Sequence, residues 1–99
     1  DKPDLIITSG GTGFGKRDVT PEALQEICER SISGFGELLR KDGADITDMS
    51  WLSRSCAGLI GETLVIALPG SPKAVREGLE ALLPILPHAL KMIEGKGHE

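Results

Sequence analysis

The feature that most constrains this fold is an unbroken apolar run, Leu64–Leu68, which stops at Pro69-Gly70. Strands that are apolar on both faces are typical of parallel sheets covered by helices on each side. A second apolar run lies within Asp4–Thr8 and stops at a glycine-rich loop. Helical spacing resumes after each loop, which gives two strand–loop–helix units. The sequence therefore predicts an α/β fold of the three-layer α/β/α type, with a mostly parallel sheet and one β-hairpin.

Local signals set the expected element boundaries. Thr20 and Ser71 are expected N-caps, because each precedes a proline at the first helical position. Branched residues favour a hairpin of two strands, Leu52–Ala57 and Thr63–Leu68. The other expected elements are a helix from Thr20 through Cys28, a short helix over Phe35–Lys41, a turn over Gly58–Gly61, a helix from Pro72 and a last helix through Ile93.

Size and charge restrict the class of protein. The chain has 99 residues, enough for one domain. Its net charge of −4 argues against a nucleic-acid partner, since phosphate neutralisation requires a basic face. The longest apolar run is far shorter than the ~20 residues that span a bilayer. Cys28 and Cys56 show no metal-ligand spacing and are expected to be small hydrophobic residues. We therefore expect a cytoplasmic protein that acts on small molecules.

The glycine-rich loop after the first strand carries the clearest chemical signal. Gly10 and Gly15-Lys16 nearly match a P-loop, but Arg17 stands where Ser or Thr must hold Mg²⁺. The segment Asp18–Pro21 also delays the helix, and Lys16 occupies the third glycine position of a dinucleotide fingerprint. Two interpretations remain from the pattern, namely a flexible turn between strand and helix and an anion cradle.

The anion cradle is the preferred interpretation. Glycine backbone can approach phosphate oxygens closely, and a threonine hydroxyl adds a donor. Arg17 can add a charge-assisted contact, and Asp18 can be an oxygen ligand for Mg²⁺ on a polyphosphate. The alternative for Asp18 is a carboxylate that caps the helix entry. The predicted cradle consists of Gly10, Gly11, Thr12 and Gly13.

Several segments, taken together, resemble one known family. The chain resembles the Mog/MoaB-like molybdopterin-binding domains, which include the molybdopterin adenylyltransferases and the G domain of gephyrin. The resemblance runs along nearly the whole chain. The matching segments are Gly10–Gly13, Arg17–Ala23, Leu52–Ser55 with Gly58 and Gly61, Leu68–Val75, and Ala81–Pro84 through His88–Leu90.

This resemblance implies an activity and a site. The activity is the Mg²⁺-dependent transfer of AMP from ATP to molybdopterin, which releases pyrophosphate. It implies that Gly10–Gly13 binds a phosphate-bearing ligand and that Asp18 is a catalytic carboxylate that handles Mg²⁺. The pterin site is bordered on one side by Ser53, Arg54 and Ser55, and on the other by Pro69, Gly70, Ser71 and Pro72.

The resemblance also implies partners and one alternative function. Family members tend to be homotrimers, and a downstream molybdenum-insertion domain or protein is an expected partner. The alternative is a non-catalytic module that binds molybdopterin or serves as a trimerising scaffold. On the expected strand, Ser53 and Ser55 alternate with Arg54, so either the serines or the arginine face the ligand. Trp51 is expected to pack, and His88 to lie on a helix surface.

The chain departs from the family at its start. Family domains begin earlier, with a first strand, a Ser-Asp-Arg type loop and a second acidic segment. The chain is therefore expected to be the C-terminal portion of a domain and to be inactive alone. The absent strand is expected to leave an apolar sheet edge that favours pairing or aggregation. A frayed tail is expected at residues 95–99.

Overall fold

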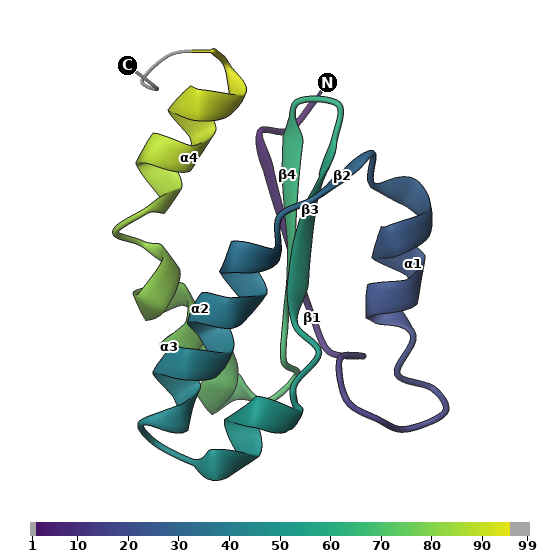
Figure 1. Cartoon of the computed structure of the whole chain (residues 1–99), viewed down its shortest axis with the longest axis vertical. Helices are drawn as coiled ribbons and strands as arrows, with labels where there is room; N and C mark the ends of the chain where they lie inside the picture. Colours follow the sequence, from purple (N-terminus) through teal and green to yellow (C-terminus); the bar gives the residue numbers. More distant parts are fainter. Residues whose placement is uncertain (1, 96–99) are drawn as a thin grey trace.

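The computed structural model describes residues 2–95, in which a four-stranded sheet lies between helices on both faces (Figure 1). This arrangement confirms the predicted three-layer α/β/α fold. The strands are β1 (Leu5–Ser9), β2 (Arg30–Ser31), β3 (Cys56–Ile60) and β4 (Thr63–Leu68). The helices are α1 (Thr20–Ile27), α2 (Ser33–Ala44), the 3₁₀ helix η1 (Asp48–Leu52), α3 (Pro72–Leu82) and α4 (Leu86–Ile93).

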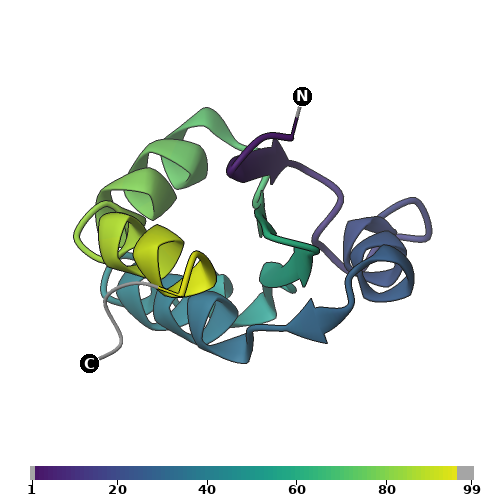
Figure 2. The same cartoon turned by 90° about the horizontal axis from the view of Figure 1, so that it is seen from above.

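Strand β4 lies inside the sheet and has a core on each face. Leu64, Ile66 and Leu68 pack in one cluster with residues of α2, α3 and α4. Val65 and Ala67 pack with Leu24 of α1 in a second cluster. The alternation follows from the two-residue period of a strand. Seen from above, α1 lies on one side of the sheet and α2, α3 and α4 lie on the other (Figure 2).

The sheet is mixed, so the expectation of a mostly parallel sheet is not met within residues 2–95. Its strand order is β1-β4-β3-β2, in which β1 pairs with β4 in parallel and the other two pairings are antiparallel. The predicted hairpin is confirmed, but its turn is Gly61-Glu62 and not Gly58–Gly61. Gly61 supplies the positive φ of +59°. Gly58 stays in β3, where a Cβ would lie 2.8 Å from the Arg30 carbonyl oxygen.

The strand expected over Leu52–Ala57 begins only at Cys56. Leu52 ends η1, and residues 53–55 are irregular. In this segment Arg40 Nη1 donates to the carbonyl oxygens of Ser53 and Ser55 at 3.2 and 2.9 Å. A side chain from α2 thus takes the acceptors that a neighbouring strand would otherwise use. Helix α2 itself is longer than expected and covers Ser33–Ala44.

The exposure of several side chains tests the remaining predictions about the sheet edge, Trp51 and His88. Strand β1 pairs only with β4 among the described residues, and its Ile6 and Ile7 are 38% and 37% exposed, as an apolar edge predicts. Trp51 is 57% exposed, so the expectation that it packs is wrong. His88 is exposed on α4, as predicted. Residues 96–99 of the expected frayed tail lie outside the described part of the chain.

Candidate functional site

Three predicted segments meet at one edge of the sheet. Because β1 and β4 are parallel, the loops that follow them leave the same edge, and the antiparallel β3 begins there. A Cβ on Gly70 would lie 3.2 Å from the Cα of Gly10, so the two loops touch. The Arg54 backbone N–H donates to the Thr12 carbonyl oxygen at 2.8 Å. The segments brought together are Gly10–Gly13, Ser53–Ser55 and Pro69–Pro72.

The first turn of the glycine-rich loop requires glycine at two positions. Gly10 and Gly11 have φ of +97° and +74°, in the left-handed region. A Cβ on Gly11 would also collide with Oγ1 of Thr20. That hydroxyl donates to the Gly10 carbonyl oxygen at 3.0 Å. The N-cap of α1 is therefore Val19 and not the predicted Thr20. The Thr20 side chain instead connects the start of α1 to the loop.

The backbone of this loop presents unused donors. Gly10 donates its N–H to the Leu68 carbonyl oxygen at 2.9 Å. The next three N–H groups, those of Gly11, Thr12 and Gly13, form no hydrogen bond within residues 2–95. Consecutive backbone donors of this kind are the usual protein means of holding an anion. Thr12 as a whole is only 4% exposed, so its N–H and the predicted hydroxyl donor are both largely shielded from solvent.

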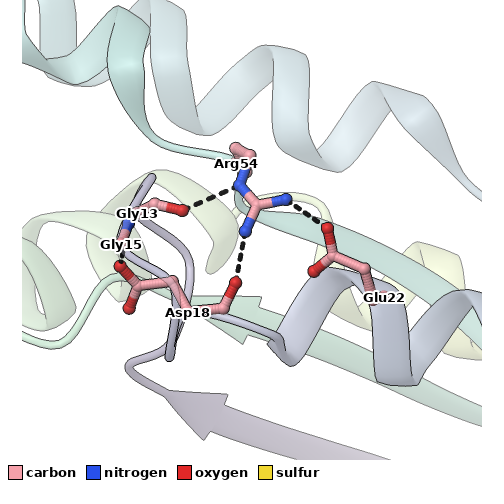
Figure 3. Close-up of polar contacts among 5 residues, drawn as sticks. All are labelled: Gly13, Gly15, Asp18, Glu22 and Arg54. Atoms are coloured by element: carbon pink, nitrogen blue, oxygen red, sulfur yellow. Dashed lines mark hydrogen bonds and ion pairs between the residues drawn. The ribbon is translucent and has the colours of Figure 1, made fainter.

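Asp18 closes the second half of the loop. Its Oδ2 accepts a hydrogen bond from the Gly15 N–H at 2.8 Å (Figure 3). A Cβ on Gly13 or Gly15 would lie 2.9 Å from that oxygen, which explains the glycines around it. The other carboxylate oxygen forms no hydrogen bond among the described residues. Asp18 thus shapes the loop with one oxygen and has the second available as a ligand.

Arg54 fastens the loop to α1, and we call its contacts the Arg54 clamp. Nε donates to the Gly13 carbonyl oxygen at 2.8 Å, and Nη2 donates to the Asp18 carbonyl oxygen (Figure 3). Nη1 forms an ion pair with Oε2 of Glu22 at 2.6 Å. The hydrogen bond from Arg54 lowers the pKa of Glu22 below its ordinary value of 4.5. Each of the three guanidinium nitrogens thus donates to a protein group.

The two predicted serines differ in access. Ser55 is 2% exposed, and its hydroxyl lies 2.9 Å from that of Ser53. Ser53 also accepts the Ser55 N–H at 3.2 Å. Because these residues are not on a strand, the expected choice between serines and arginine does not apply. Arg40, which holds both carbonyl oxygens, was missed by the sequence reasoning because its partners lie 13 and 15 residues away.

The remaining predicted residues lie at the rim. Arg17 is exposed and forms no hydrogen bond or ion pair within the described part of the chain. Ser71 accepts the Ala74 N–H at 3.1 Å and is the N-cap of α3, as predicted, with Pro72 as the first helical residue. Pro69, together with Ser53 and Ser55, lines a cavity of about 210 Å³ between α2 and α3.

The charged side of the site is a second cavity of about 460 Å³, lined by Lys16, Asp18, Glu22 and Arg54. Residues 2–95 contain no group of three or more His, Cys, Asp or Glu side chains that could enclose a metal ion. Mg²⁺ commonly takes one or two carboxylates and completes its shell with phosphate oxygens and water. The available oxygen of Asp18 fits one such ligand position.

None of the described helices has the length and apolar character needed to cross a membrane.

Known proteins match the chain in sequence and in structure. A family model described as a probable molybdopterin binding domain matches residues 1–88. A molybdopterin adenylyltransferase of Helicobacter pylori is 45% identical over 92 residues, which are 93% of this chain and 52% of that protein. The gephyrin of Dictyostelium discoideum is 48% identical over 96% of this chain and 13% of its own length. The chain thus spans about half the length of the H. pylori relative.

Solved structures agree with this assignment. The Mog protein from Mycobacterium ulcerans has a TM-score of 0.90 and 44% identity, over 94% of this chain and 61% of that chain. MoaB from Thermus thermophilus has a TM-score of 0.85 and 53% identity, over 97% of this chain and 60% of that chain. Sequence, fold and the glycine-rich loop therefore lead to one conclusion: the chain belongs to the molybdopterin-binding domain family.

Proposed function

We propose that the parent of this chain serves molybdenum cofactor biosynthesis by transferring AMP from ATP to molybdopterin. The observation that carries the proposal is the set of three consecutive unused N–H groups at Gly11–Gly13, which suits a phosphate. The substrate is suggested by relatives that are named molybdopterin adenylyltransferase.

In the proposed reaction, an oxygen of the molybdopterin phosphate attacks the α-phosphorus of ATP, and pyrophosphate leaves. Such a transfer depends mainly on alignment and on neutralisation of charge. The N–H groups of Gly11–Gly13 orient phosphate oxygens, and the exposed Lys16 and Arg17 add positive charge. Asp18 would supply one oxygen to a bound Mg²⁺, and the metal would neutralise phosphate charge there. Ser53 and Gly70 border the pterin.

The test is Asp18→Asn in the full-length parent. The amide still accepts the Gly15 N–H through its oxygen but loses the negative charge that attracts Mg²⁺. We expect the rate of adenylyl transfer to fall by about 100-fold or more, with the midpoint of Mg²⁺ activation shifted to higher concentration. Asp45→Asn, at the exposed C-cap of α2, is the matched control. An unchanged rate in Asp18→Asn would remove Asp18 from the mechanism.

The same assay addresses the alternative of a binding or scaffold module. A wild-type parent that binds molybdopterin but forms no adenylylated product would favour that alternative. A relative from Synechococcus elongatus is named a molybdenum cofactor biosynthesis bifunctional protein, and the chain covers 30% of it. We propose accordingly that the adenylylated product passes to a molybdenum-insertion domain or protein.

A further inference from the structure

The irregular segment before β3, which we call the serine segment, runs from Ser53 to Ser55 and is anchored to helix α2. Both serine carbonyl oxygens accept hydrogen bonds from the same nitrogen, Nη1 of Arg40, at 3.2 and 2.9 Å. Between the two serines, Arg54 donates its N–H to the Thr12 carbonyl oxygen at 2.8 Å. The serine segment is thus held by α2 through its carbonyl oxygens and by the glycine-rich loop through one N–H.

One face of α2 is shaped to receive this segment. A Cβ on Gly36 would collide with the Ser55 carbonyl oxygen and would lie 2.9 Å from Nη2 of Arg40. A Cβ on Gly43 would collide with the Ser50 hydroxyl, which donates to the Arg40 carbonyl oxygen at 2.9 Å. Residues four and three positions apart share one face of a helix, so the two glycines flank Arg40. In Figure 1, α2 ends near the sheet edge from which the loops of the site leave.

The guanidinium group of Arg40 is directed at backbone oxygens and not at a carboxylate. Within residues 2–95, Arg40 forms no ion pair. A hydrogen bond from a charged donor is stronger than one from a neutral donor, and a shielded carbonyl oxygen that loses its donor is left unsatisfied. Because two carbonyl oxygens of the segment are fixed in this way, Arg40 also sets where the hydroxyl groups of Ser53 and Ser55 lie.

We propose that Arg40 is a positioning residue for molybdopterin binding, which acts through the backbone of the serine segment. This inference rests on the proposed function, in which Ser53 borders the pterin, and it assigns control of that border to a residue on α2. Arg40 holds the border at a fixed distance from the glycine-rich loop, because the same segment is bonded to Thr12 on its other side. Loss of the Arg40 contacts lets the border move, whereas Asp18 keeps its own contact within the loop.

Steady-state kinetics of adenylyl transfer by the full-length parent test the proposal. Arg40→Met keeps an unbranched stem on α2 and removes the donors and the charge. We expect the KM for molybdopterin to rise by about tenfold, because small displacements of positioning groups are costly, with kcat and the KM for ATP unchanged. Lys41→Met is the matched control, because it removes one positive charge from the next, exposed residue of α2. An unchanged KM for molybdopterin in Arg40→Met overturns the proposal.

The conservative variant Arg40→Lys separates anchoring of the backbone from a general loss of packing. Both hydrogen bonds come from a single nitrogen, so a lysine ammonium group with three donors can replace it. We expect Arg40→Lys, whose side chain is one bond shorter, to restore part of the affinity for molybdopterin. A loss as large as that in Arg40→Met would contradict anchoring through the two carbonyl oxygens.

Gly36→Ala displaces the serine segment while Arg40 stays in place. The added Cβ meets the Ser55 carbonyl oxygen and pushes the segment away from α2. We expect the same selective rise in the KM for molybdopterin, and this variant decides the case if urea unfolding shows that Arg40→Met does not fold. Gly34→Ala is its control, because a Cβ there meets no atom within 4 Å. Wild-type kinetics in Gly36→Ala would show that the position of the segment does not affect binding.

The two proposals fail in different ways. The dissociation constant of molybdopterin, measured by calorimetry without ATP, reports on Arg40 independently of transfer. A wild-type parent that binds molybdopterin but transfers no AMP refutes the proposed function, and weaker binding by Arg40→Met still supports the positioning role. Full transfer with equal molybdopterin affinity in the wild type and Arg40→Met refutes the positioning role and leaves the proposed function intact.

Discussion

Arg54 is the single residue that most shapes the candidate site. Its side chain donates to the carbonyl oxygens of Gly13 and Asp18, which lie 41 and 36 residues away in the sequence. It also donates to the Glu22 carboxylate on α1. Because three of its five N–H groups donate to the protein, we infer a positioning role for Arg54, and its contact with a ligand stays a prediction. The groups that we propose to face the ligand are the loop N–H groups and Asp18.

Arg54→Gln is expected to raise the pKa of Glu22 toward its ordinary value, because the hydrogen bond from Arg54 is the main cause of the lowered value. A lowered folded-state pKa means that the ion pair stabilises the protein above about pH 4.5 and that this contribution is lost as pH falls through the lowered pKa. A carbon-13 NMR titration of the Glu22 carboxyl measures both values. Arg17→Gln, which removes a charge outside the clamp, should leave the Glu22 titration unchanged; an equal shift there would assign the effect to net charge.

Gly11→Ala is expected to destabilise the protein more than Gly61→Ala. Both glycines have positive φ, which costs a residue with a Cβ about 1–2 kcal/mol. Gly61 has open space around it, whereas a Cβ on Gly11 collides with Thr20. Urea unfolding of the two variants gives the comparison. Equal losses would mean that the loop can move away from α1 without cost.

At the scale of elements, the Ser71 side chain caps the N-terminus of α3. Ser71→Ala is expected to lower the free energy of unfolding by about 1 kcal/mol through loss of the α3 N-cap, and Ser71→Asp to retain the cap. Thermal unfolding measures both. If Ser71 also binds an anionic ligand, Ser71→Asp will lose ligand affinity while its stability is kept; unchanged affinity would remove Ser71 from the binding site.

Elements with a strong local signal were predictable from the sequence. The apolar run of β4, the proline starts of α1 and α3, and the hairpin follow from periodicity and backbone restriction. The meeting of the loops after β1 and β4 follows from the ends of these parallel strands, whereas the place of residues 53–55 was implied only by the family resemblance. Strand β2 and the irregular segment 53–55 could not be found in this way, because Arg40 and the close approach of Arg30 to Gly58 act across long sequence separations.

At the scale of the whole molecule, the unpaired edge of β1 is the main liability. Its backbone lacks a second partner among the described residues, and Ile6 and Ile7 are partly exposed beside it. We expect the 99-residue chain on its own to associate in a concentration-dependent manner, and Ile7→Lys to reduce the association, because charge on an edge strand opposes pairing. Light scattering over a dilution series measures it. A monodisperse wild-type chain at high concentration would contradict this expectation.

The central place of β4 has a consequence for how the protein unfolds. Its alternate side chains belong to opposite cores. Displacement of β4 therefore opens both cores at the same time. Loss of β4 also removes the parallel pairing with β1 and the hairpin pairing with β3. Both layers of helices should therefore melt in a single cooperative transition, and the loops at the sheet edge should keep their relative positions until that transition occurs.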